Sequence, residues 1–235
     1  MSITTETHGQ AAERVICDLS GLPNSLKNRS DPTYEEKLKP LISEALKELP
    51  TITKHTGLDK GLGGGQSKST IDFYLEGEKT LSVKCFKSSS PMACASEVGQ
   101  ASWEKLEKYY KNLLQKNNIE YLNEENYKLL LHRSIHEFVQ IQLDHLFSCS
   151  FLLYIQLRKK DSFYKIVTRE MYEKKISNYS WKLENFNATK AGINWTRSIN
   201  YRYNNISLIN AQIHGGRTPM KFRFNLRNLC RLIKL

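Results

Sequence analysis

Long apolar runs, a secretion signal and paired cysteines are what this sequence lacks. No apolar stretch approaches the roughly 20 residues that a membrane-spanning helix needs. The N-terminal segment MSITTETHGQAAERV has neither the basic start nor the apolar centre of a signal peptide. The five cysteines are scattered, and none forms the CxxC pair typical of zinc or redox sites. We therefore expect an intracellular folded protein with reduced cysteines that act as packing groups.

Acidic residues are missing from the last part of the chain. After Glu184 no Asp or Glu follows, whereas nine Lys and Arg do. Residues 151–235 carry 17 Lys and Arg against four acidic residues, while residues 1–150 carry 18 against 20. This asymmetry indicates a polyanion partner for the C-terminal third. The alternative is a solvated basic face, but neutral surfaces normally mix both signs of charge.

Hydrophobic periodicity predicts an α/β fold in which helices flank a central mixed β-sheet. A length of 235 residues suits one domain. Residues 1–30 are polar and expected to be partly flexible, and residues 185–235 form a basic subregion of short strands and loops. We expect helices over 31–50, 96–116, 123–147 and 169–178. We expect strands over 70–75, 80–86, 151–157, 164–167, 194–202, 206–214 and 220–226.

The predicted hairpin over residues 70–86 carries a possible catalytic group. Side chains alternate along a strand, so Ser82 and Lys84 share one face while Val83 points to the core. Asp72, on the preceding strand, can reach that same face. Phosphodiester cleavage needs a hard cation held by oxygen ligands and a group that stabilises negative charge on phosphorus. Asp72 and Lys84 suit these roles, although many surface hairpins without catalysis share this pattern.

A second metal carboxylate could come from the first predicted helix. Glu35 and Glu36 lie in its opening turn. Acidic residues are favoured there by the helix dipole without any catalytic role. We therefore name Glu35 as a candidate metal ligand, with Glu36 as the weaker choice.

The last predicted strand presents two cations. In Met220–Phe224 the alternation places apolar side chains on one face and Lys221 and Arg223 on the other. Arg and Lys match the O6 and N7 acceptors of guanine in the major groove. The alternative is an edge strand with solvated charges.

We assign no chemical role to two other sequence patterns. The glycine-rich loop over residues 55–69 lacks the closing Gly-Lys-Ser/Thr spacing of a nucleotide-binding P-loop. His132 and His136 are four residues apart on a helix but have no third ligand or HExxH motif nearby. We interpret both histidines as surface or packing residues.

Several of these segments resemble small type II restriction endonucleases of the MspI-like group. The similar stretches occur in the same order over residues ~33–225, and Ser82 replaces the Asn or Gln found in that group. The segments are Thr33–Leu38, Gly64-Gly65 followed by Lys68–Asp72, Ser82-Val83-Lys84, Ser88-Ser89, Phe151–Leu157, Asn194-Trp195-Thr196 and Met220–Arg223.

The resemblance implies a PD-(D/E)xK nuclease core that uses Mg²⁺ and leaves 5′-phosphate ends. By position, Asp72 is similar to the metal carboxylate and Lys84 to the catalytic lysine. Ser82 corresponds to the variable second position of the motif.

The resemblance also implies a set of DNA contacts. Lys221 and Arg223 are similar to base-reading residues near the C-terminus of that group. Asn194, Thr196 and the turn that contains Arg217 would lie near the DNA.

Residues and resemblance together favour a type II site-specific deoxyribonuclease in a bacterial cytoplasm, working as a monomer or homodimer on double-stranded DNA. Two guanine-preferring cations favour a short GC-rich palindrome, GCGC or CCGG. One alternative is a non-catalytic basic module that binds DNA or RNA. Another is a nuclease with the same core that recognises DNA structure in repair.

Overall fold

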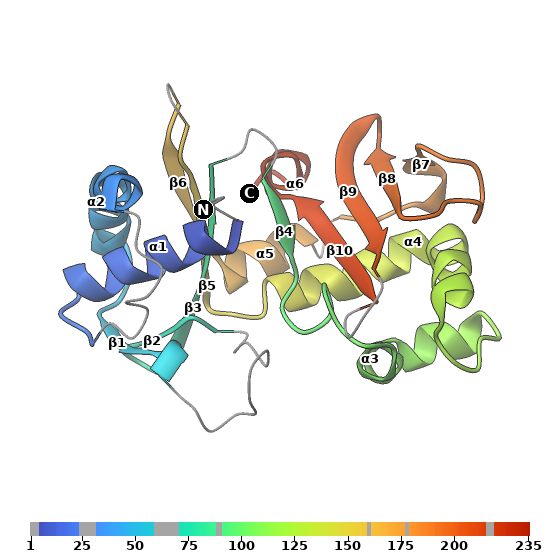
Figure 1. The fold of residues 1–235 in the computed structure, drawn as a ribbon, viewed down its shortest axis with the longest axis horizontal. Helices are drawn as coiled ribbons and strands as arrows, with labels where there is room; N and C mark the ends of the chain where they lie inside the picture. Colours follow the sequence, from blue (N-terminus) through green and yellow to red (C-terminus); the bar gives the residue numbers. More distant parts are fainter. Residues whose placement is uncertain are drawn as a thin grey trace. The chain divides into compact units, whose positions relative to one another are not determined.

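The computed structural model divides into two compact units (Figure 1). It describes residues 5–23, 32–58, 71–87, 91–158, 161–176, 179–214 and 219–235. The first unit comprises Met1–Pro91 and Phe147–Tyr172, and the second comprises Met92–Leu146 and Glu173–Leu235. The expectation of a single endonuclease domain over the whole chain stays a prediction.

The first unit contains a five-stranded mixed sheet in the order β1-β2-β3-β5-β6. The pair β3–β5 is parallel, and the other neighbours are antiparallel. The α/β class with a mixed sheet is therefore confirmed. The strands are β1 (Ile52–His55), β2 (Phe73–Leu75), β3 (Lys79–Phe86), β5 (Phe151–Gln156) and β6 (Phe163–Thr168).

The predicted hairpin is present as β2 and β3. Phe73 pairs with Leu81, and the turn places Gly77 at φ 71° and Glu78 at φ 59°. Glycine adopts such positive φ values without steric cost, which explains its place in this turn. β2 is shorter than predicted, and Asp72 lies directly before it, donating its backbone N–H to Leu81 O at 2.9 Å.

Two helices pack against one face of this sheet (Figure 1). They are α1 (Thr5–Leu19) and α2 (Pro32–Lys47). The second matches the predicted first helix, whereas the sequence interpretation assigned no helix to residues 1–30 and was wrong there. Five residues of α1 are fully buried: Ala11, Ala12, Val15, Ile16 and Cys17.

The alternation on β3 separates the core from the opposite face of the sheet. Leu81, Val83 and Cys85 belong to the cluster that packs with α1 and α2. Because neighbouring side chains point to opposite faces, Ser82 and Lys84 lie on the face away from that cluster. This confirms the predicted alternation and places both polar side chains together.

The second unit contains another five-stranded sheet, in the order β4-β10-β9-β8-β7. All its strand pairs are antiparallel. The C-terminal region, predicted from the sequence as short strands and loops, therefore builds a second sheet of its own. The strands are β4 (Met92–Cys94), β7 (Phe186–Ala188), β8 (Ser198–Tyr203), β9 (Ile206–Ile213) and β10 (Met220–Asn225).

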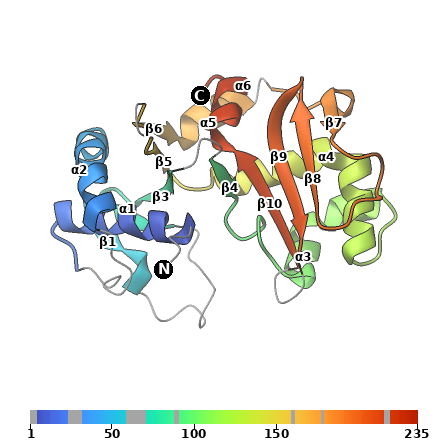
Figure 2. The same cartoon turned by 45° about the horizontal axis from the view of Figure 1, so that its top comes forward.

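Helices α3 (Trp103–Lys116) and α4 (Glu124–Leu146) belong to the second unit. In Figure 2, α4 passes behind β8, β9 and β10. The contact is aromatic: the rings of Phe138 and Phe222 lie 5.0 Å apart, and Phe138 also stacks on Tyr110 at 4.3 Å. One face of the sheet thus faces α4 with the fully buried Met220, Phe222 and Phe224.

The remaining helices are short. Among the described residues they are α5 (Arg169–Ile176), α6 (Leu226–Leu232) and the 3-10 helices Thr56–Leu58 and Leu183–Asn185. The helix predicted over 169–178 is confirmed as α5. Within the described residues, no helix has the length and apolar character needed to cross a membrane.

Candidate functional site

Three predicted site residues meet beside β3 in the first unit. Ser82 Oγ donates a hydrogen bond to Asp72 Oδ2 at 3.2 Å, and Lys84 Nζ donates to Ser82 Oγ at 3.0 Å. The backbone N–H of Val83 donates to the same Asp72 oxygen at 2.6 Å. Ser82 is only 2% exposed. The hydroxyl therefore links the carboxylate to the ammonium group and fixes their relative placement.

The environment of Asp72 disfavours its charge. Burial raises the pKa of Asp72, and the negative charge of Glu13 adds to this increase. The positive charge of Lys84 and the hydrogen bonds from Val83 and Ser82 oppose it without cancelling it. A buried carboxyl group with a raised pKa is typical of functional sites, because a bound cation can compensate for its charge.

Glu13 is a site residue that the sequence interpretation missed. It lies on α1, and its charge affects Asp72. His55 of β1 lies 3.1 Å from Glu13, measured from Nε2 to Oε2, and is 2% exposed. The apolar spacing of Ala11, Ala12, Val15 and Ile16 was the available signal for a helix that carries this glutamate.

Glu35, the carboxylate that the sequence favoured, has a different partner. Arg14 Nε donates to Glu35 Oε1 at 2.6 Å, and the two side chains are 3% and 14% exposed. This ion pair joins α1 to α2. A metal role for Glu35 stays a prediction, whereas Glu13 is the acid that acts electrostatically on Asp72. Glu36 is exposed and pairs with Lys39.

Asp72 and Glu13 are two acidic residues of this unit whose charges interact, which makes them candidates to hold a cation. Within the described residues, no cluster of three or more His, Cys, Asp or Glu side chains could bind a metal ion. Mg²⁺ does not require such a cluster, because it commonly uses one or two carboxylates together with water and substrate phosphates. The two acids therefore fit Mg²⁺ better than zinc, which needs three or four protein ligands.

Cysteines near this cluster remain thiols at neutral pH. Burial raises the pKa of Cys85 to about 12 and also raises that of Cys149. No disulfide bond joins the five cysteines, of which all but Cys94 are buried: Cys17, Cys85, Cys94, Cys149 and Cys230.

Lys221 and Arg223 lie together on β10 in the second unit, on the face opposite to Phe222. Both are half-buried. Arg223 Nη2 donates to Asn210 Oδ1 of β9 at 2.6 Å. The predicted alternation on this strand is confirmed, and the guanidinium is held by an amide instead of lying loose in solvent.

The face around these cations is polar and carries no negative charge. The five strands of this sheet contain no Asp or Glu. Cross-strand pairing places further uncharged or basic side chains on the same face: Asn187, Ser198, Asn200, Arg202, Ser207, Asn210 and Gln212. Such a surface suits the phosphates and base edges of nucleic acid.

The structure describes only some of the other residues that were predicted to contact DNA. Asn194 and Thr196 are exposed and flank Trp195, which is 2% exposed. Lys128 Nζ lies 5.2 Å from the centre of the Trp195 ring, so Trp195 anchors this segment to α4. Arg217 and the Gly215-Gly216 turn lie outside the described residues. DNA binding by Asn194 and Thr196 stays a prediction.

The remaining candidates are not part of either group. His132 is exposed, and His136 Nε2 lies 3.5 Å from Glu137 Oε1.

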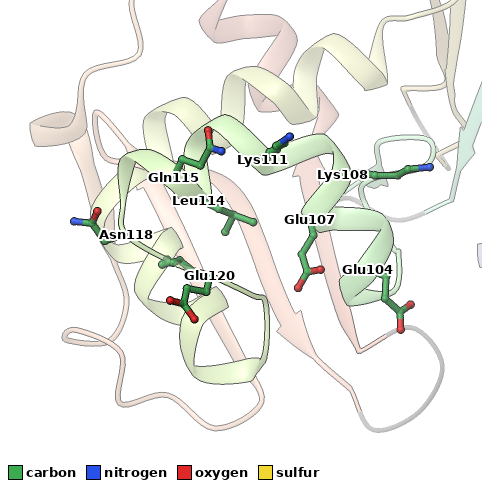
Figure 3. Close-up of a pocket in the computed structure, with 9 residues that line it drawn as sticks. Glu104, Glu107, Lys108, Lys111, Leu114, Gln115, Asn118 and Glu120 are labelled. Carbon is green, nitrogen blue, oxygen red and sulfur yellow. The ribbon is translucent and has the colours of Figure 1, made fainter.

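A hollow of about 700 Å³ lies along α3, and Figure 3 shows both acidic and basic side chains around it. Its lining contains none of the predicted site residues, so we assign it no catalytic role: Glu104, Glu107, Lys108, Lys111, Leu114, Gln115, Asn118, Ile119 and Glu120.

Comparison with known proteins gives no family assignment. No protein-family model matches the chain, and no curated protein is significantly similar to it. The resemblance to MspI-like enzymes therefore stays a prediction based on the residues quoted above.

Proposed function

We propose that this protein is a Mg²⁺-dependent endonuclease of the type II restriction class with a PD-(D/E)xK core. The observation that carries the proposal is the hydrogen-bonded series from Lys84 through Ser82 to Asp72. It connects the ammonium group of Lys84 to the half-buried carboxyl group of Asp72. Few structural roles need this combination, because burying a charged pair usually costs more than it contributes.

Asp72 and Glu13 would hold the metal ion. Burial and, to a smaller extent, the charge of Glu13 raise the pKa of Asp72, and a bound cation would offset both effects. Bound Mg²⁺ would supply Lewis-acid polarisation of a phosphate oxygen and lower the pKa of bound water. Val83 N–H holds one oxygen of Asp72 at 2.6 Å and so restricts rotation of the carboxylate.

Lys84 would serve the reacting phosphate. Its ammonium group can orient the attacking water or stabilise the additional negative charge that develops on phosphorus. Ser82 holds Nζ of Lys84 at 3.0 Å, which limits the freedom of a long side chain before DNA binds. Ser82 is thus a positioning residue in this proposal and not a metal ligand.

The second unit would bind double-stranded DNA. Its acid-free sheet offers cations for phosphates and for guanine edges. With Lys221 and Arg223 as base-reading residues, the expected target is a short GC-rich palindrome, GCGC or CCGG, cut to leave 5′-phosphates. A palindromic target suits a homodimer or two successive monomer events.

A non-catalytic nucleic-acid-binding protein is the second candidate. The polar, acid-free sheet of the second unit favours it, because that surface explains binding without any use of Asp72 or Lys84. This candidate predicts equal DNA binding with and without Mg²⁺ and no change in the DNA.

A plasmid digest distinguishes the two candidates. Wild-type protein is incubated with a mapped plasmid in Mg²⁺ or in EDTA, and the ends are sequenced. Lys84→Ala is compared with Lys79→Ala, an exposed lysine at the start of the same strand. The nuclease proposal expects discrete fragments only in Mg²⁺, their loss in Lys84→Ala and their retention in Lys79→Ala. Uncut plasmid with wild-type protein, or full cutting by Lys84→Ala, would overturn it.

A further inference from the structure

A row of three polar side chains crosses the second sheet. Asn200 on β8 is the direct register partner of Asn210 on β9, which is also the partner of Arg223 on β10. Direct partners in an antiparallel pair share a face, so all three side chains project from the face opposite to Phe222. Sequence alone does not reveal this row, because its members lie on three separate strands.

The row is a continuous hydrogen-bond chain. Asn200 Oδ1 accepts from Asn210 Nδ2 at 2.8 Å, and Asn210 Oδ1 accepts from Arg223 Nη2 at 2.6 Å. Both ends of the Asn210 amide are therefore engaged. This fixes the orientation of the amide and, through it, the plane of the guanidinium.

Arg223 retains a donor for a ligand. Its Nε is buried and has no hydrogen-bond partner among the residues that the structure describes. Asn210 thus engages only part of the guanidinium, and because the Arg223 side chain is half-buried and not fully enclosed, its remaining donors can serve a ligand. A guanidinium presents its donors in a planar fork that matches two adjacent acceptors.

We propose that Asn210 is a positioning residue that orients Arg223 for guanine recognition, which makes this row a specificity determinant. The inference rests on the proposed function. Guanine offers two acceptors, O6 and N7, on its major-groove edge, whereas adenine replaces O6 with an amino donor. A fork that cannot rotate is repelled by adenine, whereas a freely moving arginine can turn to a phosphate instead.

The neighbouring row provides the contrast. Lys221 pairs in register with Gln212, whose Oε1 lies 3.1 Å from His214 Nε2. The side chain of Gln212 thus contacts a residue two positions further along the chain, whereas the side chain of Asn210 hydrogen-bonds to residues on both neighbouring strands. Lys221 contributes a compact charge on a flexible stem. Base discrimination is therefore expected to depend on Asn210 much more than on Gln212.

The test uses a library of duplexes in which a short run of base pairs is randomised. Wild-type protein, Asn210→Ala and Gln212→Ala each cut the library in Mg²⁺, and the cut ends are sequenced. We expect Asn210→Ala to lower the guanine preference at one position of each half-site by about tenfold or more. Gln212→Ala should keep the wild-type preference. Asn210→Asp, which retains an acceptor oxygen at the same place, should restore most of the preference.

Two further measurements separate positioning from general damage. The salt dependence of binding should be unchanged in Asn210→Ala, because no charge is removed. The library result should also be independent of any change in the thermal midpoint, since cut sequences and not rates are compared. Wild-type guanine preference in Asn210→Ala would overturn the inference while leaving the nuclease proposal intact. Wild-type cutting without any sequence preference would overturn both.

Discussion

The two sheets of this protein differ in the ionisable side chains that they carry. In the first unit, Asp72 and Lys84 are connected through the buried Ser82 hydroxyl, close to a second carboxylate on α1. In the second unit, the sheet has no acid at all, and its cations are displayed on a polar face. The first unit brings an acidic and a basic side chain together at one site. The second unit spreads several positively charged side chains over one face of its sheet.

The difference shows what each arrangement costs and contributes. Burial raises the pKa of Asp72, so ionisation of this carboxyl group destabilises the folded state. A residue that costs stability in this way is expected to serve a function other than folding. Half-buried cations on the second sheet retain solvent and cost little, but their attraction for phosphate decreases with salt. The comparison predicts that substitutions in the first unit change chemistry and stability, while those in the second change binding and specificity.

The largest expected effect comes from removing the charge of Asp72. Asp72→Asn should reduce the cleavage rate by about 10²–10³-fold or more. It should also raise the thermal midpoint at neutral pH, by about 2–4 °C, since the neutral amide avoids the cost of the buried carboxylate. The raised pKa fixes the sign: the cost is absent at acidic pH and appears as the carboxyl group ionises. Calorimetry and plasmid cleavage check both results, and a variant that loses stability would contradict this account of Asp72.

The next effect distinguishes the two candidate glutamates. Glu13→Gln should raise the Mg²⁺ concentration for half-maximal cleavage by about tenfold or more, because a charged ligand is lost. Glu35→Gln should leave that concentration unchanged but destabilise the protein by roughly 3 kcal/mol, since the largely buried Arg14–Glu35 ion pair is lost. A Mg²⁺ titration and urea unfolding give the two readouts. The reverse pattern would return the metal role to Glu35.

Local patterns explain what could be predicted from the sequence. In the β2–β3 hairpin and in β10, apolar and polar side chains alternate around the residues of interest, and a glycine with positive φ marks the hairpin turn, so both faces could be assigned in advance. Long helices such as α4 were predicted for the same reason. These features depend on residues that are neighbours in the chain.

Features that depend on pairing in space could not be predicted. Strands β4 and β7 have three residues each, too few to show a period, so these two strands of the second sheet were not predicted. The apolar spacing of α1 could have indicated a helix, but the effect of Glu13 on Asp72 crosses 59 positions of the chain, and no local pattern shows it. The Asn210–Arg223 hydrogen bond needs the exact register of two strands, which no periodicity supplies.

A smaller effect concerns the pH dependence of the first unit. Burial opposes the charged form of His55, but hydrogen bonds and charge interactions with Cys17 and Glu13 outweigh it and raise its pKa from 6.5 to about 9. The folded state therefore binds the proton more tightly, so this stabilisation is complete below about pH 6.5 and is lost as the pH rises through about 9. His55→Gln should remove roughly 1–2 kcal/mol of it at pH 6. Urea unfolding from pH 6 to 9.5 tests this, and parallel curves for wild type and variant would contradict it.

The smallest effect tests how the second sheet binds DNA. Arg202 is exposed on β8, on the same face as Asn200. If it contacts a phosphate, Arg202→Ala should weaken binding to every duplex alike and reduce the slope of log affinity against log salt by about 0.9. Lys111→Ala removes the same charge from the exposed face of α3 and serves as the matched control. A slope that falls equally in both variants would mean that net charge alone, and not this face of the sheet, attracts the DNA.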